Sequence, residues 1–427
     1  MGLLILLGVF AVCVFIGVPV AFALAVAAVT AFFMEGLPLV VAFQRIISGI
    51  NVFSLMAIPF FIFAGELMFH GGIAIRLVRF ASAAVGKVRG GLGVVNVLSS
   101  MLFGGISGSA VADISALGSI LIPVMKEKGY DDDYAVNVTV TSSIAGILVP
   151  PSHNMILFAI AAGGGISISQ LFLAGVVPGV LMCICLAVAA YIIAVRRNYP
   201  VEVFPGFTAL FLSFVAALPG LFTAVIIVGG VLSGIFTVTE SGAFGTLYAF
   251  IVTLLVYRSL SWEAFKTAVI NSVRTTSMVL ILVASATAFA YMLTFYQVPS
   301  RMIDFMTGVT ENPIGMLLMI NAMLLILGMI MDMAALILIC TPIFLPVVIS
   351  IGMDPVQFGM VLMMNLGLGL CTPPVGACLF LGCAVGKVPI ERAVKTIWPF
   401  YAAILFALML TTFIPEISMT LPRLIEG

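Results

Sequence analysis

Two clusters of small, hydroxyl-bearing and helix-breaking residues are the strongest candidates for chemistry in this sequence. The first combines the Gly- and Ser-rich run 104–109 with the segment 149–154, and the second combines 328–332 with 371–376. The segments 149–154 and 371–376 each contain two adjacent prolines. Proline removes a helix hydrogen bond and so frees a carbonyl oxygen, while glycine lets two backbones approach closely. Carbonyl and hydroxyl oxygens are the ligands that a hard cation such as Na⁺ prefers, so we predict two Na⁺ sites.

The residues of the two predicted sites share this mixture of small, hydroxyl-bearing and proline-flanking positions. The first Na⁺ site is expected to contain Gly105, Ser107, Gly108, Ser109, Val149, Pro150, Ser152 and Asn154. The second is expected to contain Gly328, Met331, Asp332, Cys371, Thr372, Pro374 and Gly376. The competing interpretation of both clusters is a tightly packed pair of kinked helices, in which the small residues only allow the helices to pack closely.

Four side chains in these segments are candidates for contact with a substrate, and three of them have structural alternatives. The candidates are Ser107, Asp113, His153 and Asp332. A carboxylate deep in an apolar stretch is costly and is a functional candidate by default, which favours Asp332. The alternatives for Asp332 are a salt bridge or a hydrogen-bonded cap at the break. Asp113 fits a helix cap equally well, and His153 fits a hydrogen-bonded structural residue.

Composition places these clusters inside a membrane. The 427 residues are 63% hydrophobic and 8% charged, whereas a soluble domain carries about 25% charged residues. We therefore expect an all-α polytopic membrane protein, whose first span covers 3–34. The net charge is zero and no basic run occurs, so nucleic acid is not an expected partner. The seven cysteines form no CxxC pair, so neither a cofactor nor a metal other than Na⁺ is expected.

Two apolar stretches, 92–125 and 314–350, differ from ordinary spans because the clusters interrupt each of them halfway. Each half has about 15 residues, or ~22 Å, which is short of a ~30 Å hydrocarbon core. Both stretches are therefore predicted to be re-entrant helical hairpins, while 149–154 and 371–376 break two further spans.

The two halves of the chain repeat at one constant offset in residue number, called the repeat spacing below. The same offset separates Pro123 from Pro346, Gly146 from Gly369, and the first proline pair from the second. This predicts a first repeat at 1–205, a linking span at 206–235 and a second repeat at 236–427. The number of crossings before the second repeat is odd, so the repeats are expected to be inverted, as in many secondary transporters.

Charges in the loops set the expected orientation. With the loop 71–91 in the cytoplasm, all 17 Lys and Arg residues except Arg45, Arg301 and Arg423 lie on the cytoplasmic side. The N-terminus is then cytoplasmic and the C-terminus periplasmic, with hairpin 92–125 entering from the cytoplasm and hairpin 314–350 from the periplasm. The acidic run 131–133 is expected to be a solvated loop.

Several motifs resemble the large membrane subunit (DctM-like) of TRAP transporters. They are the run 104–113, Ile122-Pro123, Gly129-Tyr130, the segment 149–152 and the segment 371–376. The resemblance spans the whole chain and implies an elevator mechanism with Na⁺ coupling, in a bacterial inner membrane. It also implies two partners, a separate small four-span membrane subunit and a periplasmic substrate-binding protein. Divalent-anion/sodium symporters have a related fold, but their Ser-Asn-Thr tip motifs are absent here.

The expected function is Na⁺-coupled import of an organic anion, for which a sialic acid and a C4-dicarboxylate fit equally well. Half-helix N-termini at the hairpin tips favour an anion. One rival is an intramembrane serine protease, because 105–108 matches GxSG and His153 lies on another span. Against that rival, the second proline pair lacks the serine and histidine that follow the first. Another rival is a channel, which saturable, gradient-driven uptake would exclude.

Overall fold

The computed structural model describes residues 2–202 and 204–426, and the regular secondary structure within these ranges is helical throughout. The prediction of an all-α protein is therefore confirmed. The helices of the first half are α1 (Gly2–Phe15), α2 (Val20–Met34), α3 (Leu39–Ile50), α4 (Ala57–His70), α5 (Ile73–Val85), α6 (Gly91–Ser107), α7 (Ala110–Asp113), α8 (Ser119–Glu127), α9 (Asp132–Ser142), α10 (Ala145–Leu148), α11 (His153–Ala161) and α12 (Ile168–Arg196). Short 3₁₀ and π-helical turns at Phe53–Met56 and Ile114–Gly118 precede α4 and α8.

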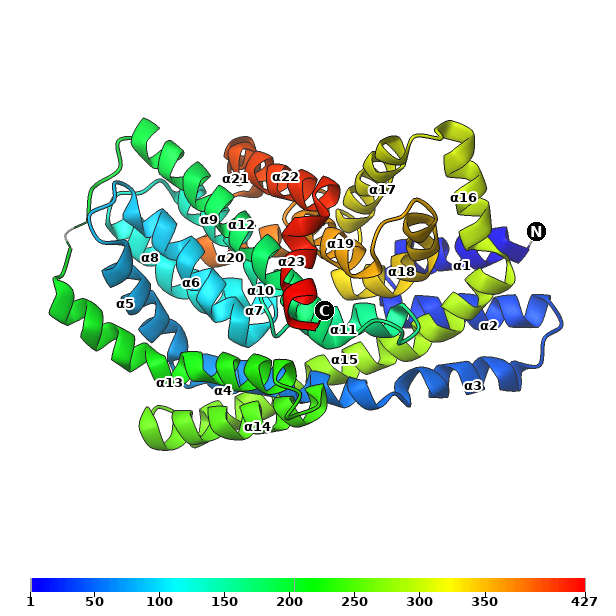
Figure 1. Ribbon diagram of the computed structural model, residues 1–427, viewed down its shortest axis with the longest axis horizontal. Coiled ribbons are helices and arrows are strands. Elements are labelled where there is room, and N and C mark those ends of the chain that lie inside the picture. Colours follow the sequence, from blue (N-terminus) through cyan, green and yellow to red (C-terminus); the bar gives the residue numbers. More distant parts are fainter. Residues whose placement is uncertain (1, 203, 427) are drawn as a thin grey trace.

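The second half contains a similar series of helices (Figure 1). They are α13 (Phe207–Leu232), α14 (Val238–Ile251), α15 (Trp262–Phe295), α16 (Val298–Val309), α17 (Pro313–Gly328), α18 (Met333–Ser350), α19 (Pro355–Leu370), α20 (Ala377–Gly386), α21 (Ile390–Thr396), α22 (Trp398–Phe413) and α23 (Pro415–Glu426). A π-helical turn at Val252–Val256 extends α14.

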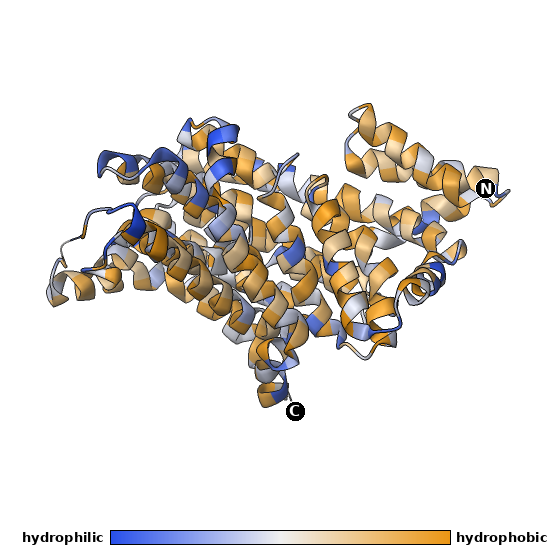
Figure 2. Cartoon of the chain, turned by 90° about the horizontal axis from the view of Figure 1, so that it is seen from above, coloured by the Kyte–Doolittle hydropathy of each residue, from blue (hydrophilic) through white to orange (hydrophobic). Residues whose placement is uncertain are grey.

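Helix length and composition agree with a membrane protein. Within the described ranges, six helices are long and apolar enough to cross a membrane, or up to eight if each of two bent pairs is one span. One bent pair is α9–α10 with α11, which meet at 54° across the first proline pair. Hydrophobic residues predominate along most of the helices (Figure 2).

The repeat spacing relates whole helices as well as single residues. The returning arms of the two hairpins begin at Ala110 and Met333, and the peptide bonds Pro150–Pro151 and Pro373–Pro374 are both cis. At the same spacing α5 corresponds to α16, and α3 with α4 corresponds to the one long helix α15. The helix α2 corresponds to α14 at the repeat spacing. The packing between the halves is therefore reciprocal, because α2 packs on α15 of the second half and α14 packs on α4 of the first.

The expected single span at 3–34 is wrong. The chain turns at 16–19, and α1 and α2 pack against each other (Figure 1). Gly17 takes a φ of 89°, which favours glycine, and Pro19 precedes the new helix. The helix expected to link the repeats, α13, packs on α14 as α1 packs on α2. The prediction of a cytoplasmic N-terminus counted residues 3–34 as one membrane crossing. The location of the N-terminus stays a prediction.

Both hairpins consist of two helical arms joined at the predicted breaks. The arms are α6 with α7 and α8, and α17 with α18. The helices α6, α17 and α18 have 17, 16 and 18 residues. They are thus slightly longer than expected, although 18 residues still rise only about 27 Å.

Candidate functional site

Each hairpin turns at a residue that caps the returning arm. At the first tip Gly108 has a φ of 61°, and the Ser109 hydroxyl accepts a hydrogen bond from the Ala112 amide at 3.4 Å. At the second tip the Asp332 carboxylate accepts one from the Ala334 amide at 3.3 Å. Ser109 and Asp332 are separated by the repeat spacing, so the two caps are equivalent. Asp332 is therefore a helix cap, which was one of its two structural alternatives.

The first tip packs directly on the first proline pair, through glycine. A Cβ atom on Gly104 would lie 2.5 Å from the Gly146 Cα, and one on Gly108 would lie 2.8 Å from the Pro151 carbonyl oxygen. Only glycine permits these two approaches. The Pro150 carbonyl oxygen also lies near Gly105, where a Cβ atom would be at an ordinary contact distance of 3.4 Å. The fold thus brings the run 104–109 and the segment 149–154 together, with carbonyl oxygens turned toward the tip.

Hydroxyl groups add to this oxygen-rich region. Ser107 is 7% exposed, and the Ser109 amide donates to its hydroxyl at 3.5 Å. Ser152 is fully buried and its hydroxyl has no hydrogen-bond partner among the described residues. Asn154 is also buried. The oxygens that a hard cation needs are therefore present at this tip.

The second tip meets the second proline pair in a related way. A Cβ on Gly369 would lie 2.5 Å from the Gly328 carbonyl carbon, and the Val375 amide donates to the Met329 carbonyl at 3.1 Å. Two oxygens of this cluster already have partners: the Thr372 hydroxyl donates to the Leu368 carbonyl at 2.7 Å, and the Tyr401 hydroxyl donates to the Cys371 carbonyl. Met331 lies in the tip, and Gly376, with φ 35°, directly precedes α20 as its N-cap. The two clusters are thus similar without being identical.

A polar contact between hairpin and broken span also occurs in both halves. Ser142 donates to the Asn96 side chain at 3.2 Å, and Asn365 donates to the Asn321 side chain at 2.5 Å. Ser142 and Asn365 are again separated by the repeat spacing. Sequence reasoning missed these contacts, although polar side chains at equivalent positions of two apolar helices were a usable signal.

A cavity of about 470 Å³ lies where the two tips approach α4 and α15. Ser107, Ser109, His153, Asn154 and Asp332 line it from the side of the hairpins and broken spans. Glu66, Asn271 and Thr275 are among the residues that line it from α4 and α15. Three of the four predicted substrate contacts therefore face one space. The fourth, Asp113, does not line it and is fully buried.

The lining of the cavity is acidic. Two carboxylates, Asp332 and Glu66, face it, and its lining residues include no lysine or arginine. The Asn271 amide donates to Glu66 at 3.1 Å, and the His70 ring nitrogen lies 3.4 Å from the same carboxylate. Glu66 was missed, although it satisfies the rule that singled out Asp332: a carboxylate inside an apolar span marks a functional site.

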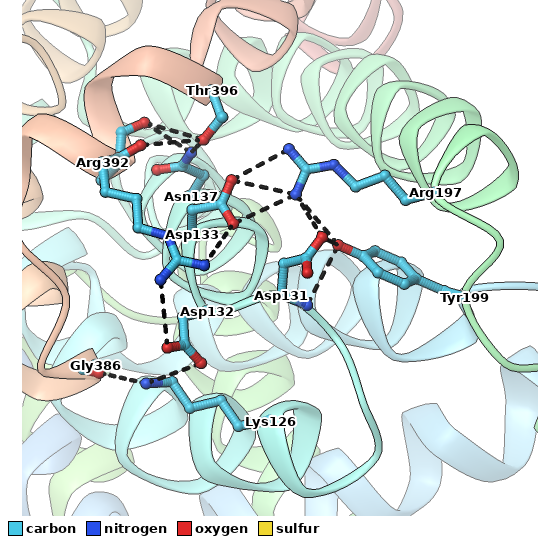
Figure 3. Close-up of polar contacts among 11 residues, drawn as sticks. Lys126, Asp131, Asp132, Asp133, Asn137, Arg197, Tyr199, Gly386, Arg392 and Thr396 are labelled. Atoms are coloured by element: carbon cyan, nitrogen blue, oxygen red, sulfur yellow. Dashed lines mark hydrogen bonds and ion pairs between the residues drawn. The ribbon is translucent and has the colours of Figure 1, made fainter.

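The acidic run 131–133 starts α9 and belongs to an ion-pair network (Figure 3). The expected solvated loop is therefore only partly correct, because Asp131 and Asp132 are 48% and 41% exposed, whereas Asp133 is buried. Arg197 at the end of α12 lies 2.8 Å from Asp131 and 3.1 Å from Asp133. Lys126 at the end of α8 lies 3.3 Å from Asp132 and donates to the Gly386 carbonyl at 2.6 Å. These contacts join helices of both halves, which the local sequence could not reveal.

Tyr130 lies beside this network, in the short loop between α8 and α9. It is 3% exposed, and its hydroxyl oxygen accepts a hydrogen bond from the Leu92 amide at 3.4 Å. Its ring packs against Tyr199, with 4.6 Å between the ring centroids. Burial raises the pKa of Tyr130 to about 12, against a smaller opposing effect of the hydrogen bond from Leu92. Tyr130 is thus a neutral, buried group that fastens the loop to the start of α6.

Among solved structures, the YdaH transporter of Alcanivorax borkumensis has the same fold. It matches with a TM-score of 0.63 and 13% identity over 89% of both chains. The chain thus shares the overall fold of that protein.

The sequence comparisons identify the family. Residues 7–417 match the family described as "Tripartite ATP-independent periplasmic transporter, DctM component". The sialic acid TRAP transporter large permease protein SiaM of Vibrio cholerae is 37% identical, over 97% of this chain and 96% of that protein. The C4-dicarboxylate large permease DctM of Rhodobacter capsulatus is 33% identical over the full length of both. The chain therefore belongs to the DctM family and is a TRAP transporter large permease, so its family is one of transporters and not of enzymes.

Proposed function

We propose that this permease imports an organic anion together with Na⁺. The observation that carries the proposal is the cavity between the two tips, which has two carboxylates and no lysine or arginine in its lining. The two carboxylates repel an anion that enters such a space unless cations are bound nearby. The positive charge of those cations must offset the buried negative charges. Bound Na⁺ supplies that positive charge, and substrate and ion then bind cooperatively.

The two Na⁺ ions would occupy the two clusters, each of which consists of one hairpin tip and the proline pair on which that tip packs. The first would lie among Ser107, Ser152 and the proline carbonyls, where the Ser152 hydroxyl has no hydrogen-bond partner among the described residues. The second would lie beside Asp332 and Thr372, where other oxygens are already engaged. Moving one uncompensated charge inward gains about 2.3 kcal/mol per 100 mV, so each additional ion strengthens accumulation.

Transport would follow an elevator mechanism. In this proposal the re-entrant hairpins and the broken spans move together across the bilayer, while the frame of α2, α4, α14 and α15 stays in place. The reciprocal packing of that frame supports an inverted repeat. Reporter fusions at both ends would test the predicted cytoplasmic N-terminus and periplasmic C-terminus.

The proposed partners are a separate small four-span subunit and a periplasmic substrate-binding protein, in keeping with the tripartite description of the family. The relatives named for sialic acid and C4-dicarboxylate make both classes candidates for the substrate. Stand-alone symport, as in divalent-anion/sodium symporters, is the alternative, and uptake without binding protein would favour it.

The test is uptake into proteoliposomes that contain this chain, its small partner and the binding protein. An inward Na⁺ gradient is compared with K⁺ for the wild type, Asp332→Ala and Asp332→Asn. Asparagine retains the helix cap and removes only the charge, whereas alanine also loses the cap, at about 1 kcal/mol. We expect Na⁺-dependent uptake that both variants weaken. Equal wild-type uptake in K⁺ would refute sodium coupling.

A further inference from the structure

Asp113 is a buried carboxylate that belongs neither to the cavity lining nor to either of the two tip clusters, so its presence needs another explanation. It is the last residue of α7 and has no exposed surface. Neither of its carboxylate oxygens has a hydrogen-bond partner among the described residues. A charge buried without a partner is strongly unfavourable, so this carboxyl group must either bind a cation or take up a proton.

The surroundings of Asp113 offer further oxygen atoms. The hydroxyl of Ser100, on α6, lies beside its carboxyl group. The Ser100 oxygen is in turn 3.0 Å from the Ser142 oxygen on α9. The π-helical turn Ile114–Gly118 begins at the next residue. Such a turn departs from the regular helical hydrogen bonding and is frequent at functional sites. The Asp113 carboxylate and the hydroxyls of Ser100 and Ser142 therefore form a buried series of neighbouring oxygens that spans α7, α6 and α9.

The second half of the chain has no equivalent of this feature. Leu336 is the counterpart of Asp113 at the repeat spacing, and α18 continues through it as a regular α-helix over Met333–Ser350. The carboxylate and the π-helical turn are thus present together in one hairpin and absent together from the other. This separates the feature from the two tip clusters, which occur in both halves.

We propose that Asp113, with the hydroxyls of Ser100 and Ser142, binds a third coupling ion, Na⁺, inside the first hairpin. This rests on the proposed Na⁺ coupling. The empty site leaves a bare negative charge in the hairpin, and moving that charge through the bilayer is costly. With Na⁺ bound the hairpin is neutral at this point and free to move. Occupancy of the site would therefore suppress movement of the substrate without its ions.

The test compares Asp113→Asn with Glu127→Gln in the reconstituted tripartite system. Glu127 is exposed at the end of α8, so its variant controls for the exchange of a carboxylate for an amide. At zero membrane potential, accumulation scales with the Na⁺ gradient raised to the number of coupled ions. Asp113→Asn should therefore lower steady-state accumulation by a factor equal to the imposed Na⁺ gradient, and lower the cooperativity of Na⁺ by one ion. Glu127→Gln should leave both unchanged.

Ser100→Ala supplies a second, independent readout, which decides the matter if Asp113→Asn does not fold. It retains the carboxylate and removes one ligand, so it should raise the Na⁺ concentration for half-maximal uptake several-fold. The stabilisation of the purified complex by Na⁺ against heat, relative to choline, should shift to higher Na⁺ in parallel.

The outcomes separate the two proposals. Wild-type uptake that proceeds equally in K⁺ overturns Na⁺ coupling and the third site together. Wild-type uptake that needs Na⁺, with an unchanged Na⁺ dependence in the folded variants, overturns the third site alone. A change in pH dependence without a change in Na⁺ dependence also overturns it, because Asp113 would then carry a proton.

Discussion

Replacing Arg197 by methionine tests how strongly the ion-pair network holds α9, α12 and α21 together. Arg197 donates to both oxygens of Asp133, at distances of 3.1 to 3.3 Å, and the Asp133 side chain is only 6% exposed. Methionine fills the same space but leaves Asp133 with the more distant Arg392, at 4.0 Å. Removing one partner of a buried pair costs about 3–5 kcal/mol. Since Arg392 remains, we expect a loss of about 3 kcal/mol, at the lower end of that range.

The assay is thermal unfolding of the purified complex, with variants arranged as a double-mutant cycle. Arg197→Met combined with Asp133→Asn should be less destabilised than Arg197→Met alone, because the buried charge of Asp133 is removed together with its partner. Asp131 also loses Arg197, but its side chain is 48% exposed and still accepts a hydrogen bond from the Tyr199 hydroxyl. The control is Lys266→Met, which breaks a pair with Glu263 whose side chains are 49% and 81% exposed. That change should stay within about 1 kcal/mol. The reasoning is refuted if Arg197→Met is no less stable than Lys266→Met.

Three further predictions concern the tips, the cavity and pH. Gly369→Ala places a Cβ 2.5 Å from the Gly328 backbone, so it should cost about 1–3 kcal/mol and abolish uptake. Gly308→Ala, which enters open space, should do neither, and equal uptake by the two variants would contradict the packing argument. Glu66→Gln removes one cavity carboxylate. Its repulsion of an anionic substrate ~8 Å away, at an effective dielectric constant of ~20, is worth roughly 2 kcal/mol. The half-saturating concentration of the anion should then fall by at least about tenfold, and an increase would refute the electrostatic argument. Because burial raises the pKa of Tyr130 in the folded state to about 12, its contribution to stability is complete below the ordinary value of 10.0 and is lost as the pH rises through the folded value. The unfolding temperature of the wild type should therefore fall more on alkalinisation than that of Tyr130→Phe, and a smaller fall in the wild type would reverse the sign we assign.

The breaks in the fold could be predicted from the sequence because glycine and proline interrupt helices through local chemistry. The tips at 104–109 and 328–332 and the two proline pairs all lie where their residues indicated. The meeting of each tip with its proline pair also followed, since equivalent residues recur at one spacing. These features depend on short stretches of backbone, so a single sequence carries them.

Features that depend on long-range contacts could not be predicted in the same way. The partners Asp133 and Arg197 are 64 residues apart, and nothing near Asp133 indicates that it is buried. The break between α1 and α2 was overlooked because the residues around Gly17 are apolar, and hydropathy alone does not show a turn inside an apolar run. The amphipathic helices α3, α5 and α16 were likewise not predicted, because total hydropathy does not indicate a helix that is apolar on one face only.

The long helix α15 and its counterpart in the first half, α3 with α4, differ in continuity. In α15, 34 residues form one uninterrupted helix, whereas its counterpart is divided into α3 and α4 by a 3₁₀ turn at Phe53–Met56, preceded by an extended Val52. A continuous ladder of hydrogen bonds resists bending, and an interrupted one does not. A lateral force from the lipid or from a partner subunit would thus bend the first-half pair at residues 51–56 more readily than it would bend the continuous helix α15. Although the two parts arise from a repeated pattern, the 3₁₀ interruption at Phe53–Met56 occurs in only one of them.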